Sequence, residues 1–140
     1  MSKNLIEMVY EFNRDIRGEA QPIRPIQLTV EQHQARAVFM SEEVIEFAEA
    51  TTPEAELDAL IDVIYFAIGG MYEMGLKDTQ IVDAFSKVHN ANMAKVAGKK
   101  AERESVQVTD ATKPADWAEP DLAVYFTDKC CGCGGCDREE

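Results

Sequence analysis

The stretch "ALIDVIYFAIGG", residues 59–70, is apolar almost throughout and carries one charged residue, Asp62. Apolar side chains surround this segment on nearly every side of a helix, a pattern typical of a buried helix. They are Leu57, Leu60, Ile61, Val63, Ile64, Phe66 and Ile68. A carboxylate removed from water is costly unless a cation pairs with it. We therefore expect Asp62 to have a cationic partner.

Hydrophobic periodicity and helix end signals place this segment in the third of four helices. Thr29 and Gln32 have the spacing of a capping box, and Thr52 precedes Pro53 as an N-cap before a first-turn proline. The predicted helices cover residues 3–17, 29–50, 53–75 and 79–98. Four helices with short links predict an all-α fold, a four-helix bundle.

The chain suits one domain followed by a tail. We expect a domain over residues 1–122, with a helical core at about 3–98 and an irregular arm at 99–122, and a tail at 123–140. Four thiols lie in that tail: Cys130, Cys131, Cys133 and Cys136. Their spacing is too tight for a zinc ribbon, so we expect a mobile tail, with a Zn²⁺ site as the alternative.

Composition limits the partners. The 26 acidic and 14 basic residues give a formal charge of −12, which argues against binding to nucleic acid or to an anionic membrane. No apolar run reaches the length of a membrane span, and the first residues lack the features of a signal peptide. With no cysteine before the tail, a reducing, cytoplasmic location is expected.

Two pairs of carboxylates stand at helical spacing. Glu43 and Glu46 are three residues apart in the second helix, and Asp58 and Asp62 are four apart in the third. Alone, the glutamate pair could be a solvated helix face. Antiparallel packing of the two helices would unite all four as oxygen ligands for Mg²⁺ or Mn²⁺. No histidine or cysteine falls among them, which disfavours zinc and iron.

Magnesium sites commonly recruit substrate phosphates, and phosphate donors follow in the fourth helix. Asn92 and Lys95 are three residues apart and can face one direction, although ordinary helix surface would look the same. Lys99 and Arg103 follow closely. The pattern indicates a phosphate-carrying substrate.

Four motifs in order resemble the all-α nucleotide pyrophosphohydrolases, the MazG-like group that includes phosphoribosyl-ATP pyrophosphohydrolase and dimeric dUTPase. These are "SEEVIEFAEA", "DALIDVIYFAIGGMYEMGL", "VHNANMAKV" and "KPADWAEPDL". The resemblance runs from about residue 5 to 122, and is closest to short phage members. One departure concerns the third helix, where the family's Glu-x-x-Asp motif has Ala59 in place of glutamate. Asp58 would substitute for it.

The resemblance implies metal-dependent hydrolysis of a nucleoside triphosphate to monophosphate and pyrophosphate. Two or three ions would be held by Glu43, Glu46, Asp62 and Asp58, with Glu42 as general base. Asn92 and Lys95 would hold the β and γ phosphates, helped by Arg103 or Lys99. If the protein is phage-encoded, it would act in the host cytoplasm.

The base of the nucleotide is expected near the first helix and the proline-rich loop. Arg24, Phe12 and Trp117 are the candidate contacts, and Trp117 could equally close the bundle or contact a subunit. An arginine can donate to guanine O6 and N7, which favours a purine deoxynucleotide such as dGTP.

Alternatives remain for both substrate and class. Phosphoribosyl-ATP is a second possible substrate, and a non-catalytic helical module that binds metal or a partner would have the same fold. The apolar third helix predicts a homodimer or homotetramer, as does the resemblance.

Overall fold

The structure is a computed structural model that describes residues 2–98 and 110–127. Its described part contains α1 (Leu5–Asp15), α2 (Val30–Glu49), α3 (Pro53–Glu73), α4 (Asp78–Met93), strands β1 (Val96–Gly98) and β2 (Asp110–Thr112), and a short 3₁₀ helix, η2 (Ala123–Tyr125). All four predicted helices are present, so the all-α fold is confirmed. The predicted tail cysteines lie outside the described residues.

The predicted helix starts of α2 and α3 are confirmed at the level of hydrogen bonds. The Thr29 hydroxyl accepts from the Gln32 amide at 3.2 Å, and the Gln32 side chain accepts from the Thr29 amide at 3.0 Å. Thr52 caps α3 by accepting from the Ala55 amide. These contacts satisfy amides that would otherwise lack an intrahelical partner.

The predicted end of the fourth helix is wrong. The helix stops at Met93 rather than Gly98, and Val96–Gly98 instead form β1. This strand pairs antiparallel with β2, Val96 opposite Thr112 and Gly98 opposite Asp110. The bonds of this ladder come from a distant segment, which a local periodicity cannot reveal.

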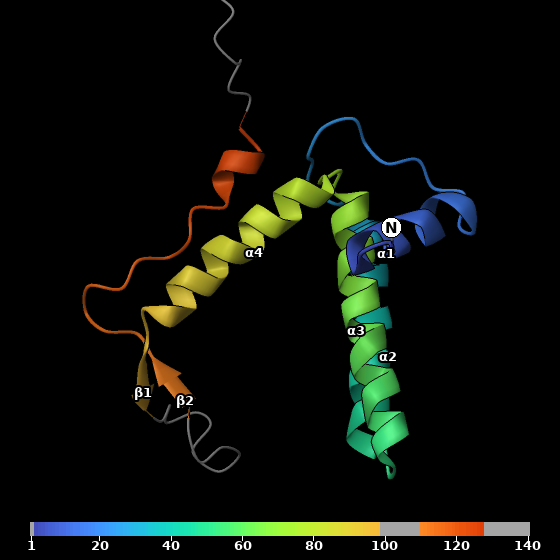
Figure 1. The fold of residues 1–140 in the computed structure, drawn as a ribbon. Coiled ribbons are helices and arrows are strands. Elements are labelled where there is room, and N and C mark those ends of the chain that lie inside the picture. Colours follow the sequence, from blue (N-terminus) through green and yellow to red (C-terminus); the bar gives the residue numbers. More distant parts are fainter. Residues whose placement is uncertain (1, 99–109, 128–140) are drawn as a thin grey trace, which may run out of the picture.

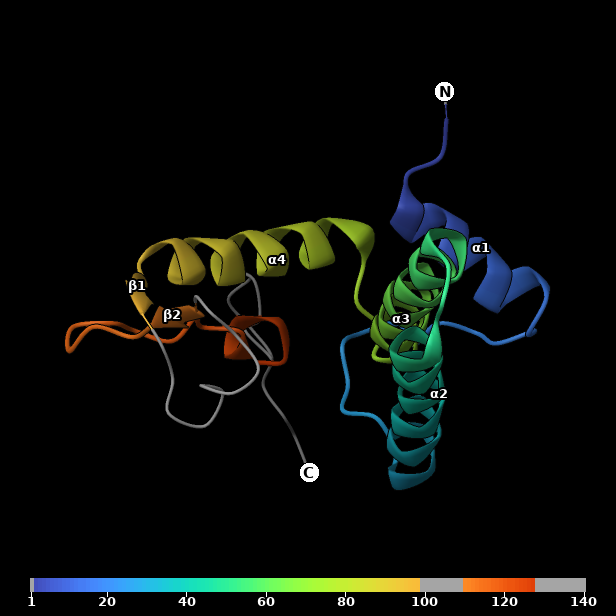
Figure 2. The same cartoon turned by 90° about the horizontal axis from the view of Figure 1, so that it is seen from below.

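The helices α2 and α3 form an antiparallel hairpin, and both views show them side by side (Figures 1 and 2). Helix α1 packs across the end of the hairpin that is remote from its turn. There Ile6 and Val9 of α1 join Ile68 of α3 in a core completed by Leu76 and Ile81. The core thus fills only one end of the hairpin.

Helix α4 leaves this unit at a sharp angle. Gly75 adopts a φ of 76°, a conformation that favours glycine, and the axes of α3 and α4 then differ by 118°. The segment 110–127 runs back along α4 (Figure 1), where the Tyr125 hydroxyl donates to Asp83 and the Trp117 indole to Ala91. Within one chain, three helices therefore pack together and the fourth projects with the C-terminal segment.

The first half of α3 is not buried within a single chain, contrary to the expectation from its apolar pattern. Leu57, Leu60 and Ile64 expose 59%, 46% and 53% of their surface, whereas Ile68 exposes 5%. The reason is that α1 covers only the second half. In the described residues, no single helix is long and apolar enough to cross a membrane, and α3 and α4 meet those criteria only together, across their bend.

Candidate active site

The hairpin brings together three of the predicted metal ligands. Loss of solvation raises the pKa of Glu43 above its ordinary value, and the negative charges of Glu46, Asp62 and Glu42 raise it further. The Glu43 Oε2 atom is buried and has no hydrogen-bond partner. We call Glu43, Glu46 and Asp62 the acidic cluster. It is a set of neighbouring negative charges.

The chemistry of the acidic cluster fits a hard divalent ion, because its donors are all carboxylate oxygens. Over residues 2–98 and 110–127, however, no three histidine, cysteine or acidic side chains already converge closely enough to hold a metal. Asp58 and Glu42 are exposed, with Asp58 one helical turn from Asp62 toward the hairpin turn.

A cavity of about 320 Å³ lies between α1, α2 and α3, beside the acidic cluster. Its lining includes Phe39, one turn before Glu43 on α2, and Phe66, one turn after Asp62 on α3. The other lining residues are Phe12, Asn13, Arg17, Arg36 and Tyr65. The pKa of Tyr65 is raised by burial and by nearby charges that include Asp62. The cavity and the cluster are thus adjacent, and Phe12, a predicted base contact, lines the cavity.

A buried ion pair stands behind this cavity, and the sequence analysis missed it. Arg36 on α2 donates from Nε and Nη2 to the two carboxylate oxygens of Glu73 on α3, at 3.0 and 2.7 Å. Asn13 of α1 accepts more weakly from Arg36, at 3.4 Å. Burial alone would raise the pKa of Glu73, but Arg36 and Arg17 hold it below its ordinary value. The only hint in sequence is an arginine between alanines in "QARAVF".

The predicted phosphate ligands lie elsewhere in the chain. Lys95 donates to the Asn92 side chain at 2.8 Å, so these two residues are neighbours as expected. Asn92 is on the projecting α4, and Lys95 lies just beyond its end; α4 diverges from the hairpin in both views (Figures 1 and 2). Trp117 packs on the same helix. Lys99 and Arg103 lie outside the described residues.

Arg24, the predicted reader of the base, lies in the loop between α1 and α2. Its backbone carbonyl packs against Gly75, just past the end of α3. That places its backbone roughly 20 Å along the α3 axis from Asp62. Within one chain, therefore, the structure joins neither Arg24 nor the α4 residues to the acidic cluster.

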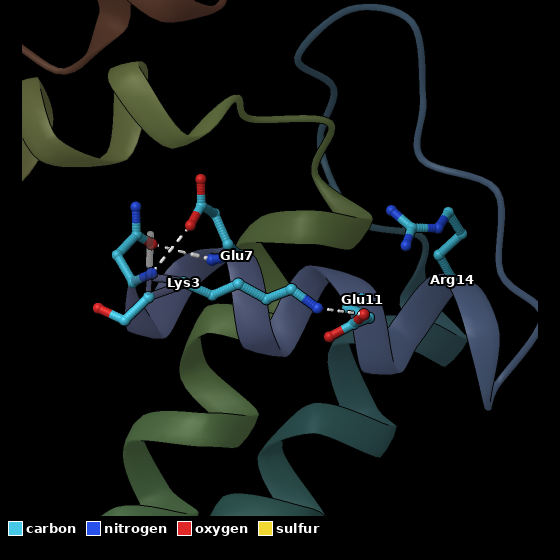
Figure 3. A pocket seen from close by; sticks show the side chains of 6 residues that line it. Lys3, Glu7, Glu11 and Arg14 are labelled. Atoms are coloured by element: carbon cyan, nitrogen blue, oxygen red, sulfur yellow. Dashed lines mark hydrogen bonds and ion pairs between the residues drawn. The ribbon is translucent and has the colours of Figure 1, made fainter.

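Another cavity, of about 520 Å³, follows the outer face of α1 (Figure 3). Its charged side chains pair locally: Lys3 with Glu11 at 2.5 Å, and Arg14 with Asp15 at 2.6 Å. Glu7 is engaged in the capping box of α1. These pairs lie on the surface and show no group poised for chemistry.

Comparison with known proteins locates this arrangement in a family. A comparison with curated proteins found no match. A family model described as phosphoribosyl-ATP pyrophosphohydrolase matches residues 9–92, more than half of the chain. The matched region runs from α1 through most of α4, and so contains the acidic cluster and the adjoining cavity. It supports pyrophosphohydrolase activity on nucleotide-like substrates. The chain therefore belongs to the phosphoribosyl-ATP pyrophosphohydrolase family, within the MazG-like all-α nucleoside triphosphate pyrophosphohydrolases.

Proposed function

We propose that this protein hydrolyses a nucleoside triphosphate between the α and β phosphates and depends on Mg²⁺ or Mn²⁺ to do so. The observation that carries the proposal is the setting of Glu43. Its Oε2 atom is buried without a hydrogen-bond partner, and its neighbours Glu46, Asp62 and Glu42 are also negative. Glu43 lies in the part of the chain that matches a pyrophosphohydrolase family. A structural carboxylate would be paired inside the protein. One that lacks a protein cation is suited to a metal ion.

In this proposal the acidic cluster holds two or three ions, with Asp58 as a further ligand. When bound, the ions supply positive charge to the phosphates and make water more acidic. Glu42 precedes Glu43 and acts as the base that accepts a proton from the attacking water. The side chains of Asn92 and Lys95 donate to the β and γ phosphates, with Lys99 or Arg103 as helpers.

Because Asn92 and Lys95 diverge from the acidic cluster within one chain, we propose that a second copy supplies them. The exposed apolar faces of α3 and α4 suit such an assembly, since Leu60 is 46% and Phe85 is 73% exposed. A homodimer or homotetramer would cover them. Sedimentation at micromolar concentration is expected to show an assembly larger than the 15.6 kDa chain, and a monomer alone would contradict it.

The nucleobase is assigned to the cavity beside the acidic cluster. The rings of Phe39 and Phe66 lie 5.3 Å apart and those of Phe12 and Tyr65 5.6 Å, which offers aromatic surface to a flat base. We favour a purine deoxynucleotide such as dGTP, with Arg24 contacting the base in the assembly proposed above, because one chain alone does not bring Arg24 to the acidic cluster. Arg24→Ala is then expected to lower kcat/KM for dGTP by about ten- to a hundredfold, more than for other nucleotides. An equal fall for all nucleotides would contradict this role.

The family description is also consistent with a second substrate, phosphoribosyl-ATP, which contains the same α–β phosphate bond. An assay of pyrophosphate release with Mg²⁺ distinguishes the two substrates. The panel contains deoxynucleoside and nucleoside triphosphates together with phosphoribosyl-ATP. We expect turnover of dGTP to be the fastest. Release from phosphoribosyl-ATP alone would identify the alternative, and Mn²⁺ binding without any release would indicate a non-catalytic module.

A further inference from the structure

The indole of Trp117 is fixed against the last turns of α4. Its Nε1 donates to the Ala91 carbonyl at 2.6 Å, and its backbone amide donates to the Pro114 carbonyl at 3.0 Å. The second bond closes a turn directly after Lys113. The ring therefore occupies a defined place beside the end of β2.

Two ammonium groups lie over this ring. The Nζ atom of Lys113 is 4.1 Å from the ring centroid, and that of Lys95 is 5.6 Å from it. Both distances are within the range of cation–π attraction. The sheet explains why the two lysines meet: Val96 pairs with Thr112, so the antiparallel register places Lys95 opposite Lys113 at the next position.

Like charges placed opposite one another on paired strands destabilise the pairing. Lys113 pairs with the carboxylate of Glu119, at 3.6 Å, and the Glu119 side chain is 82% exposed, so the attraction is weak. Lys95 donates to the neutral amide of Asn92. An anion bridging both ammonium groups would remove the repulsion, and two adjacent ammonium groups suit a polyanion such as a diphosphate.

We propose that Lys113 is a further phosphate-binding residue, and that Trp117 positions it with Lys95 to hold a diphosphate group. This rests on the proposed function only in identifying that group with the β and γ phosphates of the substrate. Trp117, which is held against α4, is thereby a positioning residue for the two lysines. The proposal adds Lys113 to the phosphate contacts and gives the indole a task other than stacking on the base.

Trp117 is the only tryptophan in the chain, so its fluorescence reports directly on this site. We would titrate the full-length protein with inorganic pyrophosphate, with and without Mg²⁺, and follow both emission and heat. The wild type should bind saturably. Lys113→Gln should weaken binding about tenfold or more, and Lys113→Arg, which keeps the charge, should recover most of it. Lys87→Gln is the matched control, because Lys87 is a lysine of α4 that pairs instead with Asp83, at 3.9 Å.

Unchanged pyrophosphate binding in Lys113→Gln, or binding by the wild type that neither emission nor heat detects, would overturn the proposal. In the hydrolysis assay, Lys113→Gln should raise KM more than it lowers kcat. A protein that binds pyrophosphate through Lys113 but cleaves no nucleotide would refute the proposed function and support this inference. If the protein cleaves nucleotides but neither its pyrophosphate binding nor its KM changes in Lys113→Gln, the proposed function stands and this inference is refuted.

Discussion

Two glutamates on the α2–α3 hairpin have opposite electrostatic settings. Glu73, 7% exposed, receives two hydrogen bonds from Arg36, and its pKa lies below the ordinary value. Glu43 has a buried oxygen without a partner, and its pKa is raised. One helix pair thus contains both a compensated and an uncompensated carboxylate. The comparison distinguishes a charge that serves the fold from one that is available to a ligand.

Removing the cation of the compensated pair should have the largest effect. Arg36→Met leaves the buried Glu73 with Arg17, at 3.3 Å, as its pairing cation, and is expected to reduce the free energy of unfolding by about 3–5 kcal/mol. Denaturant unfolding measures this. The double variant Arg36→Met, Glu73→Leu should recover much of the loss, because neither charge is then left alone. A single variant as stable as the wild type would show that the pair does not support the fold.

Two adjacent glycines on α3 test how tightly that pair is packed. A Cβ at Gly69 would lie 2.6 Å from Arg36 Nη1, whereas one at Gly70 meets only ordinary contacts at 3.8 Å. Gly69→Ala should therefore lower stability by about 1–3 kcal/mol by displacing the guanidinium. Gly70→Ala, the matched control, should raise it by up to about 1 kcal/mol through helix propensity. Thermal unfolding of the two variants tests this expectation. An equal rise in melting temperature for Gly69→Ala and Gly70→Ala would contradict it.

Removing the charge of the uncompensated glutamate, Glu43, should stabilise the metal-free protein. Glu43→Gln removes a charge repelled by Glu46 and Asp62, so the metal-free variant is expected to melt at a higher temperature than the wild type. Added Mn²⁺ should raise the melting temperature of the wild type and change that of Glu43→Gln much less. Glu31→Gln, at the exposed start of α2, should respond to Mn²⁺ as the wild type does. An equal Mn²⁺ response in all three proteins would remove Glu43 from the metal site.

The pH dependence of stability gives the smallest and most specific contrast. Because the pKa of Glu43 is raised, its ionised form destabilises the fold, and Glu43→Gln should exceed the metal-free wild type at neutral pH. That advantage should vanish as the pH falls through this pKa toward the ordinary range. The pKa of Glu73 is lowered, so the deficit of Glu73→Gln should persist to lower pH and vanish only as Glu73 itself is protonated. Parallel pH profiles for the two variants would contradict the comparison.

The features that could be predicted from the sequence are those that depend on local residue patterns. Helical spacing and caps predicted the four helices, and the spacing of Glu43, Glu46 and Asp62 on two linked helices places them within electrostatic reach of one another, although not close enough to hold a metal. The partner of Glu73 could not be found this way, since Arg36 lies 37 residues earlier. The pairing of β1 with β2 and the departure of α4 likewise depend on tertiary contacts and on the bend at Gly75. Lys113 was missed because only the strand register sets it opposite Lys95.

The central claim is that the acidic cluster is present to bind a catalytic metal. Pyrophosphate release by Asp62→Asn, with Mg²⁺ and the preferred triphosphate, tests it most directly, since asparagine keeps the size of the side chain and removes its charge. The account predicts a fall in kcat/KM of about a hundredfold or more, with the helical fold intact by circular dichroism. Hydrolysis by Asp62→Asn at the wild-type rate would contradict the claim.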